Sequence, residues 1–93
     1  MTDEVESLVT VLTDPSGDPA TRSSAATELV ALDPERALPI LLKIAEDTHE
    51  NPEMLRAAGR ELARAASRTR YLSEFELRDV SGASYEAYCD HLT

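Results

Sequence analysis

The chain has 93 residues and a formal net charge of -9, so it forms one small domain that can bury only somewhat more than about 60% of the surface of its unfolded chain. This acidic balance argues against DNA, RNA and anionic membranes as main partners, because phosphate binding depends on an excess of Lys and Arg, and it favours a basic protein. The single cysteine, the acidic N-terminus and the lack of an apolar run of ~18 residues predict a cytoplasmic protein without a disulfide, secretory signal or membrane span.

Apolar side chains recur with helical spacing in four segments of the chain. The first two segments are residues 5–12 and 25–32, and the next two are residues 38–45 and 55–66. No segment alternates in the way a strand does. The sequence therefore predicts an all-α fold in a single domain over residues 1–93.

Three helix starts carry the same chemistry, a side-chain acceptor at the N-cap followed by a proline. The dipeptides are Asp18-Pro19, Asp33-Pro34 and Asn51-Pro52. A proline at the first helical position costs little, because its missing N–H would have no partner there. Pro39 is harder to place, since proline inside a helix costs roughly 3 kcal/mol. We therefore expect a turn or a short separate helical turn over residues 34–37 and a main helix that starts near Leu38.

The chain contains an internal repeat, because residues 5–32 align with residues 38–65 at a shift of 33 positions without a gap. Six of the 28 pairs are identical: Leu8/Leu41, Asp14/Asp47, Pro19/Pro52, Ala25/Ala58, Glu28/Glu61 and Leu29/Leu62. This pattern predicts two stacked helical hairpins whose loops, residues 14–19 and 47–52, lie side by side on one edge. The small residues around Ala26 and Gly59 predict that the second helices of the two hairpins approach closely.

Two hairpins are too few to bury their own apolar faces, so residues 68–93 are expected to form a closing layer. Ser73 and Glu76 fit a capping box, which favours a short helix over about 74–80. The last helix should bury one face, formed by residues at i, i+3, i+4 and i+7: Tyr85, Tyr88, Cys89 and Leu92. Phe75 and at least one of the two tyrosines are assigned to the core, which leaves the other for a partner.

The start of the second helix resembles a HEAT-like repeat. In that family the pattern D-x-x-x-R-x-x-A-A-x-x-L opens the second helix, and five residues fill it here: Asp18, Arg22, Ala25, Ala26 and Leu29. The run Ala37-Leu38-Pro39-Ile40-Leu41-Leu42 is similar to the family's entry into the next unit. The second unit departs from the pattern, because Leu55 stands where Arg22 stands in the first. The resemblance implies a short right-handed α-solenoid of two hairpins, 5–32 and 38–66, closed by a C-terminal helical cap over 68–93.

By size, charge and architecture the chain also resembles small bacterial immunity proteins of contact-dependent and polymorphic toxin systems. That resemblance implies a cytoplasmic monomer that neutralises a basic toxin domain, such as a nuclease, in a 1:1 complex. The alternative is a general adaptor or accessory subunit that uses a HEAT-like groove, and a nucleic-acid-binding member of the family is a third class. The assignment to immunity proteins depends on analogy of fold and charge.

The partner-binding residues that we expect are the acids of the two loops together with the tail tyrosines. The set is Asp14, Asp18, Glu46, Asp47, Glu50, Glu53, Tyr85 and Tyr88. Clustered carboxylates steer and dock a basic partner, and tyrosines are enriched at binding hot spots. The alternative is that the acids cap helices or form a solvated rim, and that the tyrosines close the stack.

Arg56, Arg60 and Arg64 recur every four residues and form one stripe of the fourth helix. They could bind a phosphate or an acidic peptide, since guanidinium groups pair with such anions. We favour the structural alternative, in which they pair with acids of the closing layer: Glu74, Glu76 and Asp79.

Catalytic chemistry finds little support in the sequence. His49, Cys89 and His91 do not have the spacing of a zinc site, and Cys89 lies on an apolar face where a packed thiol is expected. There is no phosphate loop and no dinucleotide fingerprint. We expect a protein that is not an enzyme and that needs no cofactor or metal.

Overall fold

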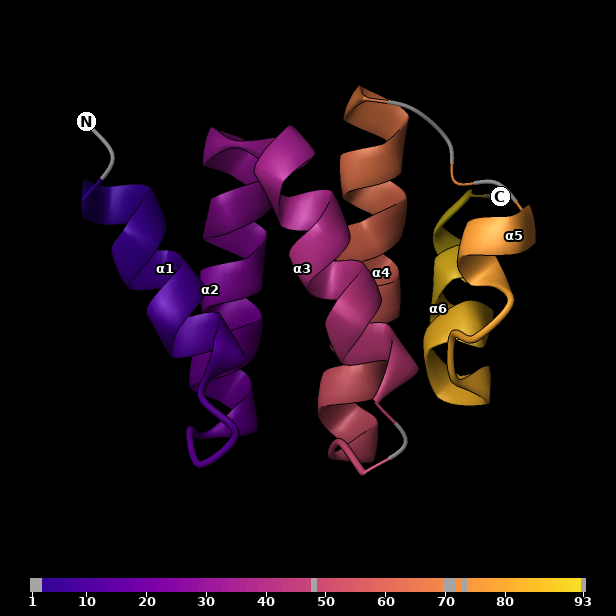
Figure 1. The fold of residues 1–93 in the computed structure, drawn as a ribbon, viewed down its shortest axis with the longest axis horizontal. Coiled ribbons are helices and arrows are strands. Elements are labelled where there is room, and N and C mark those ends of the chain that lie inside the picture. The colour runs from indigo at the N-terminus through magenta and orange to yellow at the C-terminus, as the bar shows by residue number, and fades with distance from the viewer. Residues whose placement is uncertain (1–2, 48, 70–71, 73, 93) are drawn as a thin grey trace.

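The computed structural model describes residues 3–47, 49–69, 72 and 74–92, and this part of the chain is all-helical, as predicted (Figure 1). The helices follow in the order α1 (Asp3–Thr13), α2 (Pro19–Leu32), α3 (Pro34–Glu46), α4 (Pro52–Arg68), α5 (Glu74–Leu77) and α6 (Gly82–Leu92). Helix α1 packs against α2, and α3 packs against α4. The two hairpins lie next to each other because α2 also packs against α4 and α1 touches α3.

The predicted helix starts are confirmed. The side chains of Asp18 and Asp33 accept hydrogen bonds from backbone N–H groups three residues later, at 3.3 and 3.2 Å. Asn51 accepts one from the N–H of Glu53 at 2.8 Å. A proline follows each cap at the start of α2, α3 and α4. These bonds satisfy N–H groups that the helices themselves leave without a partner.

The expected helix start at Leu38 is wrong, because α3 begins at Pro34 and runs through Pro39 without a break. Asp33 caps this earlier start, and Pro34 takes the first position. Pro39 is exposed, so its ring stands on the solvent side of the helix and only the hydrogen bond to the carbonyl of Glu35 is lost. The strong cap and the buried Ala37 and Leu38 hold the first turn in the helix.

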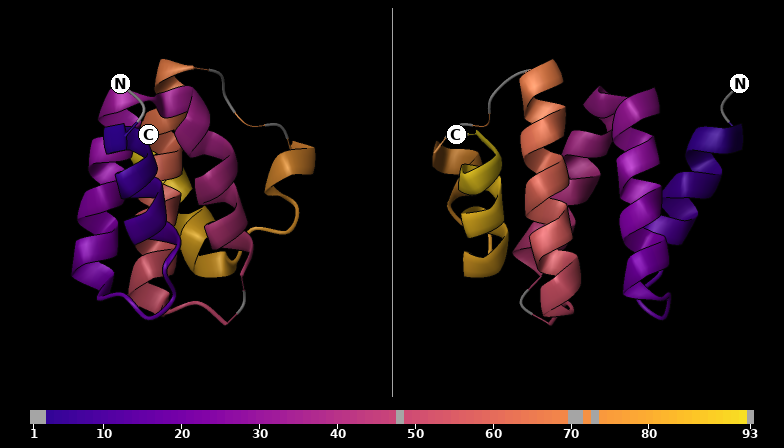
Figure 2. Two further views of the ribbon diagram at one scale, coloured as in Figure 1. Left: turned by 60° about the vertical axis from the view of Figure 1, so that its left-hand side comes forward. Right: turned by 180° about the vertical axis from the view of Figure 1, so that it is seen from behind.

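Helix α4 is the centre of the molecule. It is flanked by α2 on one side and by α6 on the other, and α3 packs on it as well (Figure 2). The side chains of Met54, Ala58, Leu62 and Ala65 are wholly inaccessible to solvent. The core thus runs along α4 and extends outward to the side chains that face it: Leu12, Leu29, Val30 and Leu41.

Gly59 permits the close approach of α6, whereas the sequence suggested an approach of α2. A Cβ atom at this position would lie 2.0 Å from the backbone oxygen of Ser84, so only glycine fits. The Ser84 hydroxyl donates a hydrogen bond to the carbonyl of Leu55, which fixes the same contact from the other side. Glycine is therefore required here by the packing of the C-terminal helix, which offsets its low helix propensity.

The buried face of α6 differs from the predicted one. Ser84 and Tyr88, one helical turn apart, point into the core, while Tyr85 is exposed. Cys89 is half-buried against the core, as expected for a packed thiol. The Phe75 side chain, and the capping box that involves Ser73, lie outside the described residues.

Candidate functional site

The two inter-helix loops form one edge of the molecule, as the repeat predicts. The α1–α2 and α3–α4 loops lie at the same end (Figure 1), and residues of both, among them Pro15 and Asp47, line an open groove of about 470 Å³. Five acidic residues are exposed along this end: Asp14, Asp18, Glu46, Asp47 and Glu53. We call these five residues the acidic edge.

The loop aspartates of the acidic edge also shape their own backbone. Asp14 Oδ1 accepts hydrogen bonds from the N–H of Ser16 at 3.0 Å and from its hydroxyl at 2.7 Å. Asp47 Oδ1 accepts one from the N–H of His49 at 2.9 Å. The Ser16 hydroxyl and N–H lower the pKa of Asp14, which keeps this carboxylate ionised. Each bond uses one carboxylate oxygen, so a local structural role and an exposed charge coexist.

Glu50 does not belong to the exposed acids, which corrects its assignment as a partner-binding residue. Its two carboxylate oxygens accept hydrogen bonds from the Arg22 guanidinium at 2.9 and 2.8 Å, and its side chain is only 10% exposed. The hydrogen bond from Arg22 lowers the pKa of Glu50, and the N–H of Asn51 acts in the same direction. Glu50 therefore joins the second loop to the first hairpin rather than facing a partner.

Arg22 is the residue whose role the sequence analysis missed. Its side chain is 3% exposed, and Nε donates to the carbonyl of Leu12 at 3.0 Å while the two terminal nitrogens bind Glu50. A signal was present, because the repeat aligns Arg22 with Leu55, a buried position in the second hairpin. A guanidinium at an inward-facing position needs a carboxylate partner, and the nearest loop supplies it.

The two tail tyrosines have different surroundings. Tyr88 is 3% exposed and packs in the core, so it is a structural residue and its assignment to the partner surface is wrong. Tyr85, three residues earlier on α6, is 48% exposed and lines a hollow with Leu77 and Val80. Tyr85 remains a candidate contact residue on a surface separate from the loops.

The arginine stripe of α4 has two different surroundings, and the expected pairing of Arg64 with the closing layer is wrong. Arg64 Nη1 binds Oε1 of the buried Glu61 at 2.7 Å, and the Thr27 hydroxyl binds Oε2 of Glu61 at 2.8 Å. Arg64 thus neutralises a carboxylate within its own helix. Arg60 and Arg56 lie one and two turns earlier, respectively, and line a separate groove.

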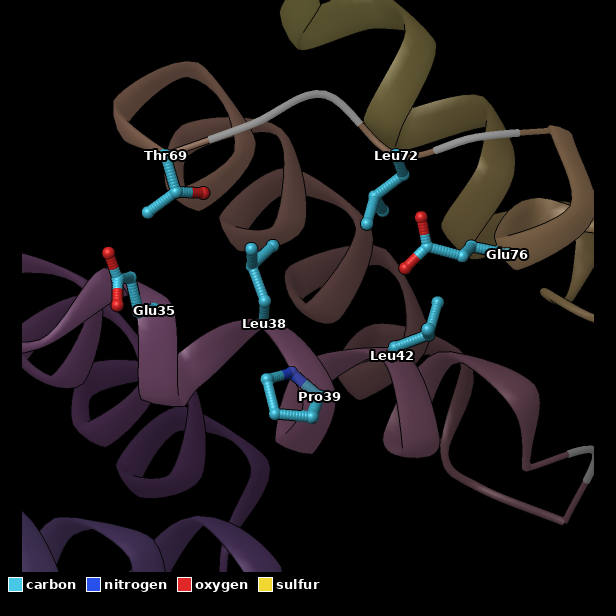
Figure 3. Close-up of a pocket in the computed structure, with 7 residues that line it drawn as sticks. All are labelled: Glu35, Leu38, Pro39, Leu42, Thr69, Leu72 and Glu76. Atoms are coloured by element: carbon cyan, nitrogen blue, oxygen red, sulfur yellow. The ribbon is translucent and has the colours of Figure 1, made fainter.

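A second hollow, of about 540 Å³, lies between α3 and the segment that leads from α4 toward α5 (Figure 3). Its lining is largely apolar, with Leu38 and Leu42 on the α3 side and Leu72 on the side across from them. Glu35 and Glu76 lie at opposite ends of this hollow (Figure 3). Because a carboxylate stands at each end, this hollow, like the acidic edge, would repel an anion.

Within residues 3–47, 49–69, 72 and 74–92, no group of three or more His, Cys, Asp or Glu side chains is arranged to hold a metal ion. In the same part of the chain, no helix combines the length and apolarity needed to cross a bilayer. Comparisons with protein-family models, with curated proteins and with solved structures give no match.

Proposed function

We propose that this protein is a short right-handed α-solenoid of two HEAT-like hairpins with a C-terminal helical cap, built to bind another protein. The contacts of α1 with α3 and of α2 with α4 support this arrangement, because equivalent helices of stacked repeats lie side by side. The equal loops and matching caps of the two hairpins support it as well. Stacked hairpins offer extended surfaces rather than enclosed catalytic pockets.

The function that these surfaces support best is that of an immunity protein, which binds a basic bacterial toxin domain and masks it. The observation that carries this proposal is the acidic edge, where two loops 33 residues apart in the sequence bring five exposed carboxylates to one end of the molecule. Such a surface accelerates the encounter with a basic partner and disfavours acidic ones. In the complex, the acidic edge would cover the basic surface with which a nuclease toxin binds its nucleic acid.

The proposal predicts that the reading frame directly upstream of the one for this chain encodes a large secreted protein whose C-terminal domain is toxic, and it is tested on that domain. Co-expression should restore growth, and the two proteins should co-purify as a 1:1 complex. Replacing three acids of the edge, E46Q/D47N/E53Q, should weaken the complex by about tenfold at low salt and flatten its salt dependence. The affinity is measured by isothermal titration calorimetry at several salt concentrations.

The matched control is E4Q/E28Q/E86Q, which removes the same charge from three exposed acids outside the edge. This variant should keep most of the affinity, because only general attraction is lost. Equal weakening in both variants would remove the acidic edge from the interface. A complex that forms without any protection from toxicity would instead indicate an adaptor.

A further inference from the structure

A groove with cationic walls crosses the face of α4 that is turned away from α3, in a chain whose charge is otherwise strongly negative. It has a volume of about 490 Å³, and residues of α2, α4 and α6 line it. In the right-hand view of Figure 2, α4 stands between α2 and α6. Arg56 and Arg60 come from α4, and His91 comes from the last turn of α6. The sequence placed the two arginines on one stripe but did not place His91 beside them.

Small side chains from all three helices also line this groove: Ala20, Ala57 and Ala87. Their short side chains leave space beside the two arginines of α4. A guanidinium group presents planar donors that match the geometry of a carboxylate. The groove therefore offers an oxyanion both hydrogen-bond donors and a surface for apolar atoms beside it.

Arg56 is the residue most available to such a ligand. It is exposed, and no ion pair joins it to any residue in the part of the chain that the structure describes. Arg60 is partly engaged, because Nη2 lies 3.4 Å from the Ser23 hydroxyl and Nε lies 3.9 Å from Glu61. Glu61 pairs more closely with Arg64, at 2.7 Å, than with Arg60. The guanidinium of Arg60 can therefore also pair with a ligand.

The balance of charge around the groove selects the kind of anion. The lining contains two arginines and one acid, Glu53, so the arginines exceed the acid by one positive charge. One carboxylate matches that excess, whereas a phosphate dianion or a nucleic acid would meet the repulsion of a chain with net charge -9. We propose that this groove binds a single carboxylate, carried by an acidic side chain of the protein partner.

The proposal rests on the proposed function only in that the natural ligand is part of a protein. Helix α4 begins beside the second loop, so the groove and the acidic edge lie on adjoining surfaces. A partner that uses both would present basic residues to the loops and one acidic residue to α4. This combination fixes the orientation of the partner, which a purely acidic surface does not.

The test uses the isolated protein and a small probe, N-acetylglutamate amide, which carries one carboxylate and no other charge. Backbone amide signals of residues 20–23, 53–60 and 87–91 should shift in nitrogen-15 NMR titrations at constant ionic strength. N-acetylglutamine amide should shift them much less. The variant R56Q should weaken binding of the probe by about fivefold, as expected for the loss of an exposed ion pair.

R36Q is the matched control, because Arg36 is also exposed and lies on α3. It should leave the titration unchanged. Equal binding of the glutamine amide, equal weakening by R36Q, or tighter binding of inorganic phosphate would overturn the proposal. Because the probe needs no toxin, a failure here is distinct from a failure of the immunity function, which is scored by growth and co-purification.

Discussion

The second helices of the two hairpins, α2 and α4, both start with a side-chain cap and a proline, and the two hairpin loops have equal lengths, but the hairpins have different neighbours. The first hairpin, α1 and α2, contacts the second hairpin on one side only, whereas α4 is enclosed between α2, α3 and α6. Equivalent positions of the repeat have diverged accordingly. Glu28 is exposed in α2, while its counterpart Glu61 is buried in α4 and held by Thr27 and Arg64.

The clearest difference is at the position of Arg22 and Leu55. Arg22 reaches the loop of the following hairpin, where Glu50 receives it. No such loop lies next to Leu55. Helix α6 packs against α4 there instead, and the Ser84 hydroxyl of α6 donates a hydrogen bond to the Leu55 carbonyl. The arginine of the repeat is thus a connection from one unit to the next, and it is absent where no further unit follows.

The largest effect on stability should come from Gly59→Ala. The added Cβ would overlap the backbone oxygen of Ser84, so α6 must move away from α4. We expect a loss of about 3 kcal/mol in the free energy of unfolding, at the upper end of the range for overpacking. Urea denaturation followed by circular dichroism measures this loss.

Ala26 occupies the equivalent position in the first hairpin and is fully buried. Ala26→Gly should cost only about 1 kcal/mol, because it lowers helix propensity without a clash. A G59A protein as stable as the wild type would show that α6 does not hold its place against α4. Similar losses in both variants would show that the two hairpins are equivalent after all.

A smaller effect should follow from Arg22→Met, which keeps an unbranched apolar stem and removes the guanidinium. Glu50 and the Leu12 carbonyl would each lose a partner in a nearly buried site. We expect a loss of about 2 kcal/mol, measured by urea denaturation. Leu55→Met at the same position of the repeat should cost less than about 1.5 kcal/mol, since it nearly conserves volume. Equal costs would mean that Arg22 contributes only packing.

Helix starts and loops could be predicted from the sequence because they depend on neighbouring residues. Asp18, Asp33 and Asn51 satisfy N–H groups two or three residues away, so the local pattern is sufficient. The start of α3 was predicted wrongly because the free-energy cost of Pro39 inside a helix was considered without the interactions that offset it. The cap at Asp33 and the burial of Leu38 hold the first turn of α3 in a helix despite the proline.

The candidate site was predicted less well, since its contacts join distant parts of the chain. Glu50 was counted with the loop acids because its partner, Arg22, lies 28 residues earlier in another hairpin. The assignment of Tyr85 and Tyr88 depended on the rotation of α6, which the contact of Ser84 with α4 sets. The periodicity of α6 alone allowed either tyrosine to face the core.

The smallest effect concerns the pH dependence of the link between the hairpins. Arg22 lowers the pKa of Glu50 in the folded protein, so the pair stabilises the fold above the ordinary glutamate range, about pH 4.3. This stabilisation is lost as the pH falls through the lowered pKa, because the carboxyl then binds a proton in both states. The free energy of unfolding should therefore decrease more steeply below about pH 4.3 in the wild type than in Glu50→Gln.

The comparison is made by urea denaturation of both proteins across that range of pH. Asp14, whose pKa is also lowered, titrates in both proteins, so its effect cancels in the difference. Glu28→Gln removes the same charge at an exposed site of the first hairpin and should keep the wild-type slope. If Glu50→Gln also keeps that slope, the ion pair does not couple the hairpins. Stacking of α2 against α4 would then hold them together without electrostatic help.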